Sequence, residues 1–98
     1  MATTTEQLRA AQVKIDEARE LVQADSTASP VLLAVVNEFA KKAAKATAST
    51  DERTAVIELE QAGDSAKAAA EADPAVSDTA RQAVIDAHMA ICIAKGKL

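Results

Sequence analysis

The spacing of the apolar residues restricts the fold of this chain more than any other feature of its sequence. In four segments, apolar residues recur three and four positions apart, which places them on one side of an α-helix. The longest unbroken run is Leu8, Ala11, Ile15, Ala18 and Val22. The pattern predicts helices at about 4–23, 30–47, 50–72 and 74–95.

Each predicted helix begins with a cap signal, either capping-box spacing or a capping residue followed by proline. In chain order the signals are Thr3 with Glu6, Ser29 with Pro30, Ser49 with Glu52, and Asp73 with Pro74. The connections are short, which favours antiparallel neighbours. We therefore predict an all-α fold, a small four-helix bundle forming a single helical domain over 1–98. It is either up-down-up-down or made of helical hairpins that pair between chains.

Small side chains limit the core that such a bundle can form. Alanine fills 25 positions, whereas the larger aliphatic residues and the one phenylalanine fill 20. A buried alanine contributes less than the ~1.5–3 kcal/mol of a buried leucine or isoleucine. We expect a thin core and a monomer of marginal stability, for which self-association is a common remedy. Gly63, inside the third helix, predicts close packing of a neighbour rather than a break.

The second half of the fourth helix is apolar around most of its circumference. Between Ala83 and Ala94, only Asp86 and His88 interrupt the apolar residues. Such a helix must be covered by the other helices or by another chain. We predict a subunit or partner interface formed by Val84, Ile85, Met89, Ile91 and Ile93. A weaker apolar line on the first helix is a second candidate contact, namely Ala10, Val13, Leu21 and Ala24.

Charge and composition argue against several classes of partner and location. The net charge is −4 and Phe39 is the only aromatic residue, which disfavours nucleic-acid binding by phosphate contacts or by base stacking. The apolar run from Val31 to Val36 is far shorter than the ~20 residues that span a bilayer. Residues 1–6 lack the basic and apolar regions of a signal peptide, and the single Cys92 suits a reducing compartment. We predict a cytoplasmic protein that binds neither nucleic acid nor membrane.

His88 and Cys92 are the one pair that suggests chemistry. Their spacing of four residues places both on one helix face, as two zinc ligands or as a thiol with its base. A complete metal site would need carboxylates such as Asp86 or a second subunit, and nothing indicates an oxyanion hole. With only two glycines, the chain has no phosphate-binding glycine loop. We expect no enzyme activity, no cofactor and no metal.

Two functions from different classes remain. The first is a non-catalytic module for protein–protein interaction, a small adaptor, inhibitor or regulator that self-associates as a homo-oligomer and binds a protein partner. The second arises from the C-terminal stretch, which contains Asp73-Pro74, Ala80-Arg81, Met89-Ala90-Ile91 and Ala94.

This stretch resembles the closing helix of the phage hairpin proteins that sequester cyclic oligonucleotide signals of bacterial defence systems. The resemblance implies an oligomeric sponge that binds cyclic nucleotides or other small anions at subunit junctions, with Arg81 holding phosphate. Lys41, Lys42 and Lys45 are further candidate ligands, although cations in the last turns of a helix also favour its dipole.

Overall fold

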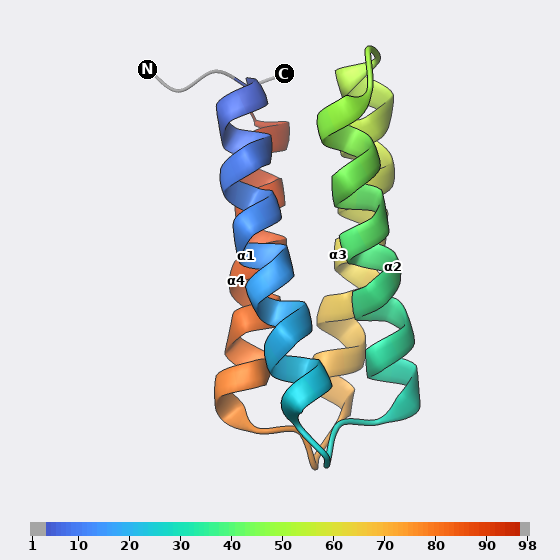
Figure 1. The fold of residues 1–98 in the computed structure, drawn as a ribbon, viewed down its shortest axis with the longest axis vertical. Coiled ribbons are helices and arrows are strands. Elements are labelled where there is room, and N and C mark those ends of the chain that lie inside the picture. The colour runs from blue at the N-terminus through green and yellow to red at the C-terminus, as the bar shows by residue number, and fades with distance from the viewer. Residues whose placement is uncertain (1–3, 97–98) are drawn as a thin grey trace.

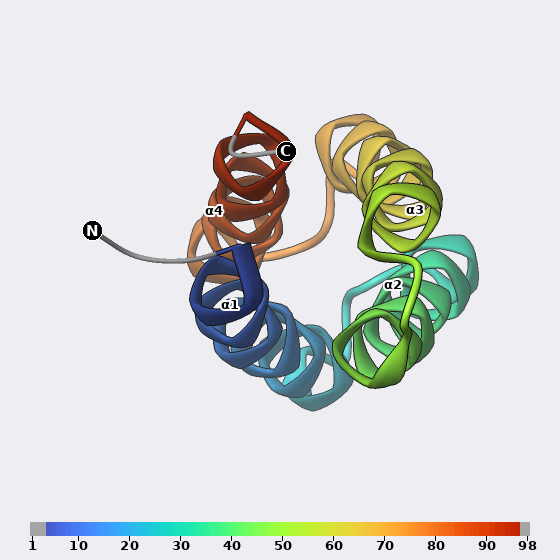
Figure 2. The same cartoon turned by 90° about the horizontal axis from the view of Figure 1, so that it is seen from above.

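The computed structural model describes residues 4–96, which form four α-helices. They are α1 (Thr4–Ala24), α2 (Pro30–Ala48), α3 (Glu52–Ala72) and α4 (Asp78–Lys95). Successive helices run in opposite directions, and α4 returns beside α1 to close the ring (Figures 1 and 2). The predicted all-α four-helix bundle is thus confirmed in its up-down-up-down form, 37 Å along its longest axis.

The two ends of this bundle carry different connections. The double-loop end holds residues 25–29, between α1 and α2, and residues 73–77, between α3 and α4 (Figure 1). The single-loop end holds residues 49–51, between α2 and α3. The last turn of α4 and the first turn of α1 lie at this second end.

One apolar core runs through all four helices. The predicted stripe on α1 is buried along its whole length, with side chains no more than 3% exposed. Alanine supplies 10 of the 21 buried apolar side chains in residues 4–96, so the core is as thin as its composition predicted. The largest buried side chain is Phe39 of α2, which is 0% exposed.

Gly63 of α3 faces Phe39 of α2 and His88 of α4. The helix is continuous through it, and the residue is buried. A Cβ atom added at Gly63 would lie 3.1 Å from Cζ of Phe39 and 3.2 Å from Cδ2 of His88. The prediction of close packing at this glycine is confirmed.

The predicted start of α3 is wrong by two residues. Asp51, not Ser49, is the N-cap, and its carboxylate accepts the Thr54 backbone N–H at 3.2 Å. The Ser49 hydroxyl oxygen instead accepts the Asp51 N–H at 3.1 Å, which tightens the turn before the helix. Two polar residues competed for the cap, and spacing alone selected the wrong one. The cap predicted at Thr3 lies outside the described residues.

The predicted start of α4 at position 74 is also wrong, because the helix begins at Asp78 with Ser77 as its N-cap. The Asp73 carboxylate accepts the backbone N–H groups of Ala75 at 3.0 Å and of Ser29 at 2.8 Å. These bonds hold Asp73 in the connection, at the C-cap of α3. Val76 is 4% exposed and joins the core, so the segment after Pro74 packs as a loop.

Candidate protein-docking surface

The predicted interface residues of α4 do not share one face. Val84 and Ile91 are 0% exposed in the core, so their assignment to an interface is wrong. They belong to the core that forms within the same chain, where α4 packs against α1 and α3. Ile85 is half-buried, whereas Met89 and Ile93 are 57% and 51% exposed on the outer side.

α1 lies beside α4 in the ring (Figure 2) and also carries exposed apolar side chains. Leu21 of α1 is 39% exposed and Val13 is 57% exposed. Within residues 4–96, α1 and α4 together carry four of the six large apolar side chains that are exposed. The remaining two, Val31 and Ile57, are on α2 and α3.

Two shallow hollows lie along the junction of these helices, which we call the α1–α4 groove. The first has a volume of about 520 Å³ and is lined by Leu21, Asp78, Thr79, Gln82, Ala83 and Asp86. The second has a volume of about 210 Å³ and is lined by Lys14, Asp86, Met89, Ala90 and Ile93. Asp86 borders both, and its carboxylate accepts a hydrogen bond from Nε2 of Gln82 at 2.9 Å.

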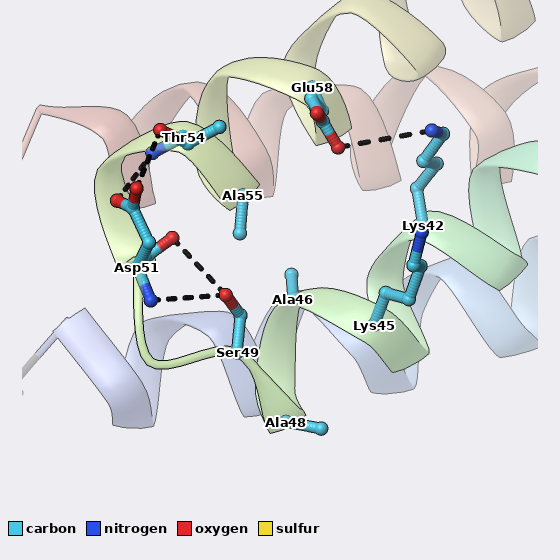
Figure 3. Close-up of a pocket in the computed structure, with 9 residues that line it drawn as sticks. All are labelled: Lys42, Lys45, Ala46, Ala48, Ser49, Asp51, Thr54, Ala55 and Glu58. Carbon is cyan, nitrogen blue, oxygen red and sulfur yellow. Dashed lines mark hydrogen bonds and ion pairs between the residues drawn. The ribbon is translucent and has the colours of Figure 1, made fainter.

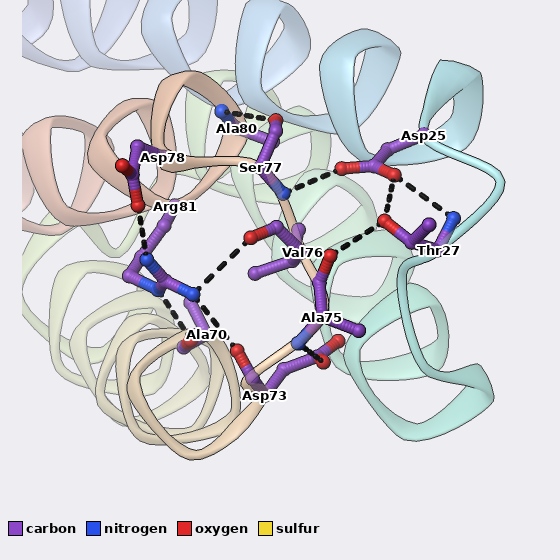
Figure 4. Close-up of polar contacts among 10 residues, drawn as sticks. All are labelled: Asp25, Thr27, Ala70, Asp73, Ala75, Val76, Ser77, Asp78, Ala80 and Arg81. Carbon is purple, nitrogen blue, oxygen red and sulfur yellow. Dashed lines mark hydrogen bonds and ion pairs between the residues drawn. The ribbon is translucent and has the colours of Figure 1, made fainter.

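Arg81, predicted to hold phosphate, is used within the fold. Its Nε donates to the carbonyl oxygen of Ala70 at 3.2 Å, and its Nη2 lies 2.9 Å from the carbonyl oxygen of Asp73 and 3.2 Å from that of Val76 (Figure 4). Its Nη1 donates to the Asp78 carboxylate at 2.6 Å. The guanidinium satisfies carbonyls at the C-terminus of α3, which leaves it no free set of donors for an anion. The assignment of Arg81 to phosphate binding is therefore corrected.

The predicted lysines lie at the opposite end of the bundle from Arg81. Lys42 and Lys45 line a pocket of about 390 Å³ between α2 and α3, which Asp51 and Glu58 also line (Figure 3). Nζ of Lys42 is 3.9 Å from Oε2 of Glu58. Lys41 is exposed and does not line this pocket. Because carboxylates line the pocket beside the lysines, the pocket does not have the concentrated positive charge that would bind an anion.

His88 and Cys92 do lie together, on the side of α4 that faces α3. Nε2 of His88 contacts Oδ1 of Asp64, and Sγ of Cys92 is 3.8 Å from the same nitrogen. Burial, followed by the carboxylates of Glu60 and Asp64, raises the pKa of the Cys92 thiol. A protonated thiol is a poor nucleophile and a poor metal ligand. No group of three or more histidine, cysteine or acidic residues in the described part of the chain is arranged to hold a metal ion.

Sequence reasoning missed part of the groove. Lys14, Ala83 and Ala90 line it, but small or charged residues on a helix give no signal of a recess. The weaker apolar line on α1 did indicate Leu21, which lines the first hollow, whereas Val13 is exposed but lines neither hollow. None of the four described helices is apolar enough, over a sufficient length, to cross a bilayer. No protein-family model matches the chain, and no curated protein or solved structure does so either.

Proposed function

We propose that this protein is a non-catalytic helical interaction module, a small adaptor, inhibitor or regulator, that binds a protein partner through the α1–α4 groove. The observation that carries the proposal is the unequal distribution of exposed apolar side chains, four of which lie on α1 and α4. A thin core gains stability from every large apolar side chain that is buried, yet Met89 and Ile93 remain outside it. Three of the four, Leu21, Met89 and Ile93, line the α1–α4 groove beside polar residues, and exposed apolar surface rimmed by polar residues is typical of protein interaction sites.

The proposal includes two expectations about context. A partner on the groove is either a different protein or a second copy of this chain, so self-association is part of what the test below measures. A cytoplasmic location is consistent with the free Cys92 thiol, since reducing compartments keep cysteines unpaired. Anion sequestration is the weaker alternative. Arg81 was its main anion-binding residue, and the guanidinium instead forms hydrogen bonds to the α3 carbonyls.

The decisive test compares Met89→Asp with Ile57→Asp. Both side chains are large, apolar and exposed, 57% and 42% respectively, but Ile57 is on α3 outside the groove. We expect both variants to keep the helical circular-dichroism signal and the thermal midpoint of the parent protein. Only Met89→Asp should abolish association, measured by sedimentation of the purified protein and by affinity capture from the native host.

Equal behaviour of the two variants in sedimentation and capture would contradict the proposal. So would unfolding of Met89→Asp, because that outcome would make Met89 part of the core rather than of an interface. The enzyme activity that His88 and Cys92 suggest is tested separately with a thiol-reactive probe at neutral pH. We expect Cys92 to react no faster than a simple thiol, because its pKa is raised.

A further inference from the structure

We infer that the partner of the α1–α4 groove is an amphipathic helix with two apolar side chains seven residues apart and a basic residue midway between them. This inference rests on the proposed function and specifies the chemistry of the partner. It is drawn from the spacing of the two hollows and from the charge between them.

The spacing of the hollows matches two turns of a helix. Ala83 lines the first hollow and Ala90 the second, and these two residues are seven positions apart on α4. On the other side of the groove, Leu21 and Lys14 are also seven positions apart and line the same two hollows. Seven residues advance a helix by about 10.5 Å, or two turns. A helix lying along the groove therefore brings its side chains i and i+7 to the two hollows.

The side chains around each hollow favour an apolar anchor. Ala83 and Ala90 are small and leave the space, while Leu21 at one hollow and Met89 with Ile93 at the other supply exposed apolar surface. A leucine-sized side chain in each hollow would cover this surface. Methionine surfaces adapt readily to a partner of this kind, because the side chain is unbranched and flexible.

The charge between the hollows selects a basic partner. Asp86 is exposed and borders both hollows, so its carboxylate lies where the middle of a docked helix would pass. The Asp78 carboxylate at the first hollow is already paired with Arg81, and Lys14, the cation lining the groove, borders only the second hollow, so Asp86 is the carboxylate left to pair with a partner. An arginine midway between the two anchors would pair with Asp86. A second copy of this chain would instead bring the same carboxylates to the interface, where like charges repel.

The test uses a designed alanine-based helical peptide with two leucines seven residues apart and an arginine midway between them. A matched peptide carries glutamate in place of the arginine. Binding of each peptide to the full chain is measured by fluorescence anisotropy, with the groove residues mapped by NMR chemical-shift changes. We expect the parent protein to bind the arginine peptide about tenfold more tightly than the glutamate peptide.

Three variants of the full chain sharpen this test. Asp86→Lys should reverse the preference, so that the glutamate peptide binds more tightly. Ala90→Leu, which fills one hollow, should weaken the arginine peptide by about tenfold. Glu38→Lys, an exposed charge reversal on α2, should leave both affinities within about twofold of the parent values.

The inference is overturned if the arginine peptide does not bind, if both peptides bind equally, or if Asp86→Lys leaves the preference unchanged. It is also overturned if the parent protein is a dimer that Met89→Asp dissociates, because a second copy then occupies the groove. In each of these cases the proposed function still stands if Met89→Asp abolishes association and Ile57→Asp does not. If Met89→Asp still associates as the parent protein does, both the inference and the proposed function fail.

Discussion

At the double-loop end, the loops 25–29 and 73–77 are joined to each other by hydrogen bonds. At the single-loop end, the hydrogen bonds of residues 49–51 stay within their own turn and the adjoining helix termini. Oδ2 of Asp25 accepts the Ser77 N–H at 2.7 Å, and Oδ2 of Asp73 accepts the Ser29 N–H at 2.8 Å. Each loop thus supplies one carboxylate to a backbone amide of the other. The Thr27 hydroxyl adds a bond to the Ala75 carbonyl oxygen at 2.6 Å (Figure 4).

The single-loop end has no equivalent bond between distant segments in its described loop. Asp51 accepts hydrogen bonds from the backbone and the hydroxyl of Thr54, three residues away. Its polar contacts between helices include ion pairs of exposed or half-buried side chains, Lys42 with Glu58 and Lys95 with Glu60. The difference teaches that directed hydrogen bonds join the two loops at one end of this bundle, whereas solvated ion pairs join α2 to α3 and α3 to α4 toward the other end.

The largest difference between the ends is expected for Arg81. The variant Arg81→Met keeps much of the apolar stem of the side chain. It removes the guanidinium that donates hydrogen bonds to the carbonyls of Ala70, Asp73 and Val76. We expect the free energy of unfolding to fall by about 2 kcal/mol, measured by urea denaturation. The matched variant Lys95→Met removes an ion pair at the single-loop end and should cost no more than about 0.5 kcal/mol. Equal losses would remove the contrast between the two ends.

A smaller effect is expected from the two loop carboxylates. Asp73→Ala breaks a bond between loops and the bond to the Ala75 N–H, while Asp51→Ala breaks only a local cap. Both should lower the urea midpoint, Asp73→Ala by more. Hydrogen exchange should then distinguish the regions, because Asp73→Ala should release the Ser29 amide at the start of α2, whereas Asp51→Ala should release the Thr54 amide. Faster exchange at both ends in either variant would contradict this assignment.

Acid should weaken the double-loop end through Asp25. Bonds from the Thr27 hydroxyl, then from the backbone N–H groups of Ser77 and Thr27, lower the pKa of Asp25 from 3.8 to about 2. Because the folded-state pKa lies below the ordinary value, this stabilisation is present above pH 3.8 and is lost as the pH falls toward about 2. We expect Asp25→Asn to flatten the pH dependence of the unfolding free energy in this range.

The variant Thr27→Val refines the acid experiment. It removes the hydroxyl that contributes most to the lowered pKa of Asp25 but keeps both backbone donors. Its pH dependence, measured by urea denaturation at stepped pH, should fall between those of the parent and of Asp25→Asn. A dependence as steep as that of the parent would show that the hydroxyl does not stabilise the carboxylate.

The smallest effect is expected at the single-loop end itself. Lys42→Met removes an ion pair whose atoms are 3.9 Å apart and whose carboxylate partner is half exposed. We expect a loss of no more than about 0.5 kcal/mol, reduced further by added salt, since exposed ion pairs are screened. Urea denaturation at low and high ionic strength measures both effects. A loss comparable to that of Arg81→Met would contradict the description of this end.

The two wrong helix starts separate what the sequence predicts from what it does not. Ser29 with Pro30 was assigned correctly, because the cap and the helix it starts are adjacent in the chain and the hydroxyl of Ser29 accepts the Leu32 N–H. Asp73 with Pro74 has the same local pattern but a different outcome. Its carboxylate is engaged by Ser29, 44 positions away, and no local pattern contains that partner.

The groove shows the same separation. The exposure of Met89 and Ile93 and the burial of Val84 and Ile91 are set by which side of α4 meets the other helices. Because α4 is apolar around most of its circumference, the spacing of its apolar residues does not indicate which side packs against the other helices. Arg81 is a similar case, since a cation at a helix start gives no sign that it will satisfy the carbonyls of the preceding helix.

Apolar spacing and short connections by themselves predicted the four helices, antiparallel neighbours and the stripes that form the core, because these depend on residues a few positions apart, but they left open whether the helices close within one chain. Only the tertiary structure decided where α4 is exposed, how the two loops bond to each other and which residues line the α1–α4 groove. These features depend on pairs of residues far apart in the chain. Their contacts exist only once α4 has packed against α1 and the ring is closed.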